Sequence, residues 1–410
     1  MESTQEKSQL LPWFRWTNGL SWPGLCILSL TLLGVLIPRV SRGDSIEPPA
    51  IRHDQIVWED DVAFSPLRSG HGRARLTLNH ELQSTAHQLL SRAHPVTGAV
   101  IALDARSGRV LVWAAFDREA RGVEAPLLDS YPAASLFKIV TTAALLEHTK
   151  IQGRKRFCTR GGQHGIERRH LDPPKPGTTV RCDSFQVALG LSRNAVYAQL
   201  ATHYLTRSQL ASTAQALGFN ETLPFDFPAQ LGRLQLPYND LEFARAAAGF
   251  QDSSITPLGA AHLAHTIAAR GERRRIYLVD AAPGYSRPKG GQRLGRALRV
   301  ETARRLRNMM EITITSGTSY ETFTDAEQRP YLGRLNVAGK TGTLRRNSDG
   351  PTTSWFVGFA PSRKPQIIVS VVLQNAPVWR QKANELGRDL MRAHFANRGF
   401  RGVTHPFSAK

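Results

Sequence analysis

The sequence predicts a single large α/β body that follows a short N-terminal head. Its 410 residues would allow two or three domains, but one large core fits the pattern better. Two observations indicate the mix of strands and helices. Near the C-terminus, the small-residue segment 337–343 and the apolar runs 354–360 and 366–373 read as neighbouring strands. Far upstream, 143–147 is rich in helix formers, and Pro132 stands where a helix can begin.

The N-terminal head is predicted to be a membrane anchor. No charged side chain occurs over 17–38, and this Leu-rich stretch has about the length that spans a bilayer. A buried core helix is disfavoured, because tryptophans crowd one end and arginines close the other. A cleaved signal peptide is disfavoured because the candidate cleavage site, 41–43, is poor and lies among arginines. We therefore expect a tail over 1–16, an anchor over 17–38 and a tether over 39–74.

Three short strings, far apart but in a fixed order, carry the chemistry. They are Ser135-Leu136-Phe137-Lys138, Ser192-Arg193-Asn194 and Lys340-Thr341-Gly342-Thr343. Each string alone is more often an ordinary helix face or turn. Their order and setting favour an active-serine acyl-transfer site.

The first string has a direct chemical interpretation. Helical residues three apart lie on one face, so the Lys138 amine is expected beside the Ser135 hydroxyl. A lysine can activate a hydroxyl only where desolvation or a cationic neighbour lowers the lysine pKa, and we expect Lys340 to be that neighbour. Ser135 is expected in the first helical turn, where free N–H groups and the helix dipole favour an oxyanion.

From about Arg75 to about Phe395 the chain resembles the transpeptidase domain of penicillin-binding proteins. Beyond the three motifs, 98–114 looks like the family's opening hairpin with its turn at 104–108, and 317–319 is also family-like. The resemblance implies a β-lactamase/transpeptidase-like α/β fold. This is an α+β sandwich in which helices flank a central antiparallel sheet and form an all-helical subdomain. We expect this domain over 75–398 and a C-terminal tail over 399–410.

The resemblance also implies roles for the first two motifs. Ser135 would attack the carbonyl of a terminal D-Ala-D-Ala peptide, and Lys138 would take its proton. Ser192 would relay a proton toward the leaving amine. Asn194 would hydrogen-bond the substrate amide and orient Lys138.

The third motif would bind the end of the substrate. Lys340 and the hydroxyls of Thr341 and Thr343 would hold the terminal carboxylate, in a strand that Gly342 leaves open to close approach. The backbone N–H groups of Ser135 and Thr343 would form the oxyanion hole.

Some positions depart from the family pattern. Arg193 is bulkier and more charged than the small or acidic residue expected between Ser192 and Asn194, which bears on substrate preference. Ala133-Ala134 replaces the frequent Pro-Gly before the serine, and 249–251 reads Gly-Phe-Gln where Gly-Gln-Gly is frequent. These changes bear on loop geometry and leave the chemical groups intact.

The implied substrate sets the compartment, because peptidoglycan lies outside the membrane. We expect a single-pass protein of the bacterial inner membrane with a cytoplasmic tail, a periplasmic tether and a periplasmic catalytic domain. In that oxidising compartment Cys158 and Cys182, which flank a Gly- and Pro-rich loop, are expected to form a disulfide. Cys26 lies inside the apolar span and is expected to be inert.

The charge pattern does not indicate nucleic-acid binding. The net charge is +20, but the basic residues are scattered over unrelated segments. A diffuse positive field suits an enzyme that lies next to anionic lipid headgroups and acts on a carboxylate-bearing polymer. No Cys/His spacing resembles a zinc site, and no cofactor is expected.

The expected function is a monofunctional peptidoglycan D,D-transpeptidase that forms a serine acyl-enzyme and binds β-lactams. Its expected partners are peptidoglycan stem peptides, the cell membrane and a peptidoglycan glycosyltransferase. A D,D-carboxypeptidase or a serine β-lactamase would share the motifs, but no Glu-x-x-x-Asn element for deacylation lies between Asn194 and Lys340. From another class, a β-lactam or muropeptide sensor would need a longer cytoplasmic segment, and an inactive scaffold would usually have lost a catalytic group.

Overall fold

The computed structural model describes residues 50–52, 55–119, 125–287, 291–345, 350–377 and 379–408. The expected tail and anchor, with Cys26, lie outside these ranges. Within them, no helix has the length and apolar character needed to cross a bilayer.

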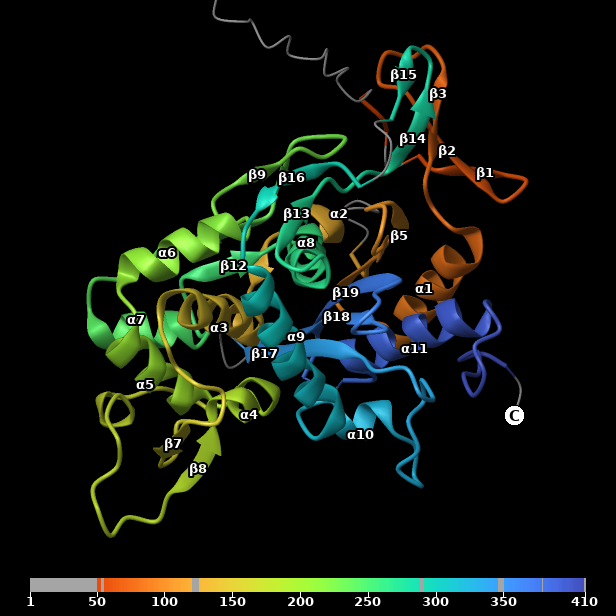
Figure 1. Ribbon diagram of the computed structural model, residues 1–410. Helices are drawn as coiled ribbons and strands as arrows, with labels where there is room; N and C mark the ends of the chain where they lie inside the picture. The colour runs from red at the N-terminus through yellow and green to blue at the C-terminus, as the bar shows by residue number, and fades with distance from the viewer. Residues whose placement is uncertain are drawn as a thin grey trace, which may run out of the picture. The chain divides into compact units, whose positions relative to one another are not determined.

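A five-stranded antiparallel sheet forms the centre of the fold (Figure 1). Its order is β17-β18-β19-β4-β5, so the C-terminal strands pair with the early hairpin along β19 and β4. The strands are β4 (Thr97–Asp104), β5 (Val110–Asp117), β17 (Ala338–Arg345), β18 (Thr352–Ala360) and β19 (Ile367–Asn375). The predicted hairpin and the three predicted C-terminal strands are thereby confirmed.

Helices cover both faces of this sheet. Successive strand side chains point to opposite faces, so each strand contributes to two apolar clusters. Val100 and Val371 join α1 (His80–Ala93) and α11 (Ala383–Ala396) on one face. Ile101, Val357 and Ile368 join α8 (Pro257–Ala268) on the other. This is the layered α+β sandwich that the resemblance implied.

The helical subdomain packs around α3 (Phe137–His148), in which every residue from Phe137 to Leu146 is buried. Its neighbours include α5, α6 and α9. The other helices are α2 (Ala125–Leu128), α4 (Phe185–Gly190), α5 (Asn194–Tyr204), α6 (Arg207–Ala216), α7 (Asp240–Ala247), α9 (Val300–Thr315) and α10 (Tyr320–Phe323).

A second sheet corrects the expected tether. It has the order β1-β2-β3-β14-β15, with β1 (Val57–Glu59), β2 (Val62–Pro66), β3 (Arg73–Leu76), β14 (Val279–Ala282) and β15 (Tyr285–Ser286). Within the expected tether 39–74, the part from Val57 onward is therefore folded, because Ala63, Leu67 and Ala74 bury their side chains in the main core. The described part of the expected tail 399–410 also packs, through Phe400, Val403 and Phe407.

Short paired strands complete the structure. They are β6 (Tyr131–Pro132), β7 (Arg156–Thr159), β8 (Arg181–Ser184), β9 (Thr222–Leu223), β10 (Ala229–Gln230), β11 (Gly232–Leu234), β12 (Ser253–Ile255), β13 (Glu272–Arg274) and β16 (Arg293–Arg296). The pairs β7–β8 and β6–β12 lie close to the site described below.

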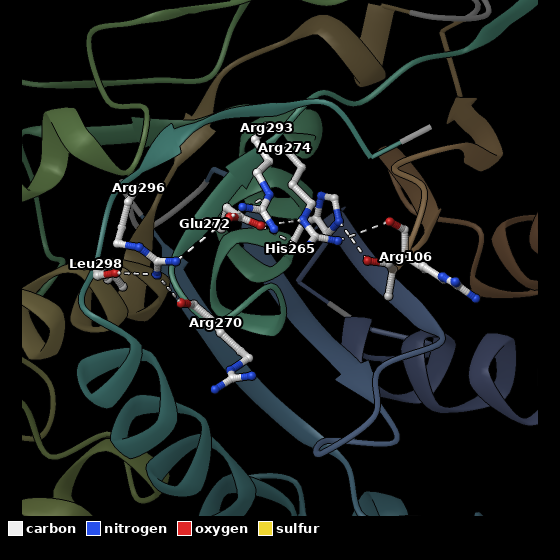
Figure 2. A network of polar contacts seen from close by, with 9 residues as sticks. Arg106, His265, Arg270, Glu272, Arg274, Arg293, Arg296 and Leu298 are labelled. Carbon is white, nitrogen blue, oxygen red and sulfur yellow. Dashed lines mark hydrogen bonds and ion pairs between the residues drawn. The ribbon is translucent and has the colours of Figure 1, made fainter. Parts of the chain in front are cut away.

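A polar network holds the two-stranded sheet of β13 and β16 beside α8 (Figure 2). The Glu272 carboxylate accepts two hydrogen bonds from Arg274, at 3.1 and 2.9 Å, and pairs with Arg293 Nε at 3.1 Å. Arg296 lies 3.9 Å from the same carboxylate and donates to the carbonyl of Arg270 at 2.8 Å. One carboxylate therefore holds together three arginines of this two-stranded sheet.

Candidate active site

Ser135 lies in a 3₁₀ turn (Ala134–Leu136) that runs directly into α3. The helix therefore begins at Phe137, and Ser135 lies one turn earlier than expected. Pro132, expected near the helix start, belongs instead to β6, which pairs with β12. The Trp355 indole of β18 donates to the Pro132 carbonyl at 2.9 Å, so the turn is tied to the central sheet.

The residue before the nucleophile has an unusual backbone. Ala134 has φ +48°, in the left-handed region that favours glycine. The frequent family residue at this position is glycine, so the alanine here accepts backbone strain that glycine would avoid. A sharp turn at Ala134 aims the Ser135 side chain into the cleft.

Lys138 contacts the nucleophile. Its Nζ lies 2.8 Å from Ser135 Oγ and donates to the Ala248 carbonyl at 2.6 Å. Both Lys138 and the helix around it are fully buried. The carbonyl of Ala248, at the end of α7, fixes the position of the amine and leaves it facing the serine.

Lys340 and Ser192 form the second half of the site. Lys340 Nζ donates to Ser192 Oγ at 3.0 Å and to the Thr341 carbonyl at 2.7 Å. Ser192 lies at the turn between α4 and α5 with φ +55°, another strained position for a non-glycine residue. Two residues far apart in the sequence are thereby brought into hydrogen-bond contact.

Asn194 is placed differently from the expectation. Its amide Nδ2 donates to the Gln163 carbonyl at 2.6 Å, while the Lys138 amine is oriented by Ala248. The expected orienting contact from Asn194 to Lys138 is therefore replaced in this structure by a backbone carbonyl. A hydrogen bond from Asn194 to the substrate stays a prediction.

The third motif lies along β17, which has an unpaired edge within the described sheet. A Cβ on Gly342 would come within 3.5 Å of the Leu136 N–H nitrogen, so the strand passes directly beside the nucleophile turn. Thr341 Oγ1 lies 2.6 Å from Thr318 Oγ1, and Thr343 lines the cleft beside Ser135. The site therefore places a hydroxyl-rich strand against the nucleophile.

Ser135 opens into a cleft with two adjoining halves. The larger, about 950 Å³, lies toward the loop at 163–167 and the turn at 248–252, and Arg245 and Arg345 line it. The smaller, about 450 Å³, lies toward Ser192, Thr318, Thr341 and Trp379. Both halves include Ser135, Gln163, Asn194 and Thr343.

Burial decides the charge of the two lysines. Desolvation lowers the pKa of Lys138 well below its ordinary value, and the positive charge of Lys340 lowers it further. Desolvation also lowers the pKa of Lys340 to about 7. The lowered pKa of Lys138 favours its neutral form, which can accept a proton from Ser135, while Lys340 is charged below about pH 7.

Cys158 and Cys182 are joined by a disulfide bond across β7 and β8. The loop that it closes contains Gln163, the partner of Asn194. Among the described residues, no cluster of His, Cys, Asp and Glu could hold a metal ion.

Several groups of the site escaped the motif search. Ala248 and Gln163 each accept a hydrogen bond through the backbone carbonyl, so their side chains give no indication of this role in the sequence. Trp379 lines the cleft from the segment before α11. Thr318 lies in 317–319, which the resemblance marked as family-like without giving it a role.

The family model "Penicillin binding protein transpeptidase domain" matches residues 98–392. This match covers well over half of the 410 residues, so the chain belongs to the penicillin-binding protein transpeptidase family.

Individual relatives agree with this assignment. Peptidoglycan D,D-transpeptidase PbpA of Mycolicibacterium smegmatis is 26% identical over 345 residues, covering 74% of this chain and 67% of that protein. Probable peptidoglycan D,D-transpeptidase PenA of Neisseria flavescens is 24% identical over 324 residues, covering 73% and 75%.

Solved structures share the fold. The D,D-transpeptidase domain of a peptidoglycan glycosyltransferase from Eggerthella lenta has a TM-score of 0.66 at 22% identity, covering 82% of this chain and 85% of that one. Penicillin-binding protein A of M. tuberculosis, as its imipenem acyl-enzyme, has a TM-score of 0.65 at 21% identity, covering 79% and 80%. The resemblance in fold is thereby confirmed.

Proposed function

We propose that this chain is a peptidoglycan D,D-transpeptidase that forms an acyl-enzyme on Ser135 and binds β-lactams at the same residue. The observation that carries the proposal is the 2.8 Å contact between Ser135 Oγ and a buried Lys138 whose pKa is lowered. The curated relatives are named D,D-transpeptidases, and penicillin-binding protein A of M. tuberculosis forms acyl-enzyme complexes with imipenem and penicillin G.

In the acylation step, Ser135 Oγ bonds to the carbonyl carbon of the penultimate D-Ala, and its proton passes to Lys138 Nζ. The oxyanion is stabilised by the backbone N–H groups of Ser135 and Thr343, each worth about 3 kcal/mol. The C–N bond then breaks, and the proton held by Lys138 passes through Ser192 to the departing D-Ala amine, so Lys138 is neutral again and Lys340, which contacts Ser192 at 3.0 Å, keeps its charge. The product is an ester on Ser135.

The terminal carboxylate is held by Lys340 and the hydroxyls of Thr341 and Thr343. Its negative charge favours the charged form of Lys340 and offsets the effect of burial. In the second step the amine of another stem peptide attacks the ester. The new amide bond forms as the ester C–O bond breaks, and the proton that the acceptor amine loses passes through Lys138 to Ser135.

Hydrolytic alternatives require a base that activates water. The larger half of the cleft is lined by the carboxyl-bearing residues Glu167 and Asp252. Glu167 pairs with Arg169 at 3.0 Å, and Asp252 accepts from Gln251 at 2.8 Å. No Glu-x-x-x-Asn element for deacylation lies between Asn194 and Lys340, which favours a transpeptidase over a β-lactamase. A D,D-carboxypeptidase is the remaining alternative.

We also propose that the catalytic domain is periplasmic, anchored by 17–38 in the inner membrane. The support is the apolar sequence over that range and a substrate that lies outside the membrane. A peptidoglycan glycosyltransferase is the proposed partner, and the support is that the D,D-transpeptidase domain from Eggerthella lenta, which shares the fold, belongs to a peptidoglycan glycosyltransferase.

The test is labelling of the full chain with fluorescent penicillin. We expect one label on Ser135 that persists for hours, and Ser135→Ala abolishes it without changing the melting temperature. Mass spectrometry that found the adduct on another serine would overturn the assignment, and loss of the label within seconds would indicate a β-lactamase. A D-Ala-D-Ala peptide given with an acceptor amine then separates transpeptidase from carboxypeptidase by the ratio of aminolysis to hydrolysis.

A further inference from the structure

The residue in the middle of the second motif has a partner that its sequence position does not explain. Arg193 Nε donates to Asp183 Oδ2 at 2.8 Å. The side chains are only 19% and 12% exposed, so water screens this ion pair less than a surface pair. Arg193 is also the N-cap residue of α5, where no side-chain capping bond forms because a guanidinium has no acceptor atom.

Asp183 is itself held rigidly. It follows Cys182 in β8, and the disulfide to Cys158 joins β8 to β7. Opposite Asp183 in the hairpin is Phe157, which is buried and packs edge-to-face on Tyr204 at the end of α5. The hairpin lies beside α4 and α5 (Figure 1), so the carboxylate has a fixed position relative to the motif.

The motif needs such support. Ser192 has φ +55°, and a non-glycine residue keeps that conformation only where its surroundings enforce it. On the side of the disulfide loop, a cavity of about 210 Å³ separates residues 159–163 from 191–195. Close packing does not fill this gap. The bond from Asn194 to Gln163 joins the two segments instead, and Arg193, which lines the cavity, is held by Asp183.

We propose that Asp183 and Arg193 are positioning residues for the acylation reaction: together they hold the turn that presents Ser192 to Lys340 and Asn194 to the substrate. This inference rests on the proposed function of Ser135. Removing either side chain lets the turn relax, which lengthens the Ser192–Lys340 contact and slows proton delivery to the leaving group. Binding of the substrate carboxylate, made by the third motif, is unaffected.

The test measures penicillin acylation by the full chain, with the acylation rate constant separated from the dissociation constant of the initial complex. We expect Arg193→Ala and Asp183→Asn each to lower the rate constant about tenfold or more, because small misplacements of reacting groups have effects of that size. The dissociation constant stays within about twofold. The acylation rate constant of the double variant should be no lower than that of either single variant, because the two residues act as one unit.

Two controls separate positioning from loss of stability. Arg181 Nε lies 3.4 Å from the same carboxylate but outside the motif, and Arg181→Ala should acylate at the parental rate. Glu272→Gln should lower the stability of the fold through a network outside the cleft, and it should keep the parental acylation rate constant.

Three results would overturn the proposal: an unchanged rate constant in Arg193→Ala, additive losses in the double variant, or an equal loss in Glu272→Gln. Absence of acylation in the parental chain would instead overturn the proposed function. The two failures are therefore distinguishable.

Discussion

At the scale of single residues, the site depends on two buried amines that lie close enough to affect each other's charge. Lys138 must be neutral to accept the Ser135 proton, and Lys340 must be charged to hold a carboxylate. Burial lowers both pKa values, and the charge of Lys340 lowers that of Lys138 further. The acylation rate of the free enzyme should therefore fall at low pH as Lys138 gains a proton, and above about pH 7 as Lys340 loses one.

The variant Lys340→Gln tests this coupling. Without the neighbouring charge the pKa of Lys138 rises, so the acidic limb of the profile moves to higher pH, and the alkaline limb disappears. The measurement is the pH dependence of the second-order acylation rate. Lys150→Gln, which changes an exposed lysine outside the cleft, is the control and should keep the parental profile. An acidic limb that stayed in place in Lys340→Gln would contradict the electrostatic link.

Residue-scale chemistry was largely predictable, because it depends on side-chain types at fixed spacing. Ser135, Lys138, Ser192 and Lys340 come together as the motifs indicated. The contacts of Asn194 were not predictable, since they depend on where the backbone of Gln163 runs.

At the scale of elements, the central strands were predictable and the short ones were not. The runs at 354–360 and 366–373 are almost continuously apolar, and such segments form buried strands. Strands β1 to β3 are short and carry charges such as Glu59, Arg73 and Arg75, so their alternating buried residues gave only a weak signal. The start of α3 was misplaced because the left-handed backbone of Ala134 has no sequence signature.

The two-stranded sheet of β13 and β16 depends on Glu272, whose side chain is 11% exposed. Glu272→Gln leaves Arg274, Arg293 and Arg296 without their shared countercharge. Breaking a buried pair costs about 3–5 kcal/mol, and the partial exposure of the arginines reduces this to about 2 kcal/mol. We expect the melting temperature to fall by about 4 °C in a thermal scan.

The matched control for this change is Glu301→Gln, because Glu301 and its partner Arg304 are both more than half exposed. Surface pairs of this kind contribute little, so the melting temperature should stay within about 1 °C of the parental value. Equal shifts in the two variants would show that the Glu272 network does not stabilise the β13–β16 sheet.

At the scale of the whole molecule, the folded body begins earlier than the family motifs suggest. The expected start at Arg75 falls inside β3, which pairs with β2 on one side and β14 on the other. The described residues, from Ala50 to Ser408, all fall in one compact unit. The second sheet is thus part of the catalytic body, joined to it through the main apolar core.

Two shortened chains test this boundary. A chain that begins at Ile46 should fold and be acylated by penicillin at the parental rate. A chain that begins at Arg75 loses β1, β2 and the buried side chains of Ile51 and Leu67, which together contribute about 3 kcal/mol or more. Its melting temperature should be lower by about 5 °C or more, and its exposed β3 edge should promote association. The measurements are thermal unfolding and sedimentation of both chains. If the two chains were equally stable, the folded body would begin at Arg75, and β1 and β2 would not be needed for its stability.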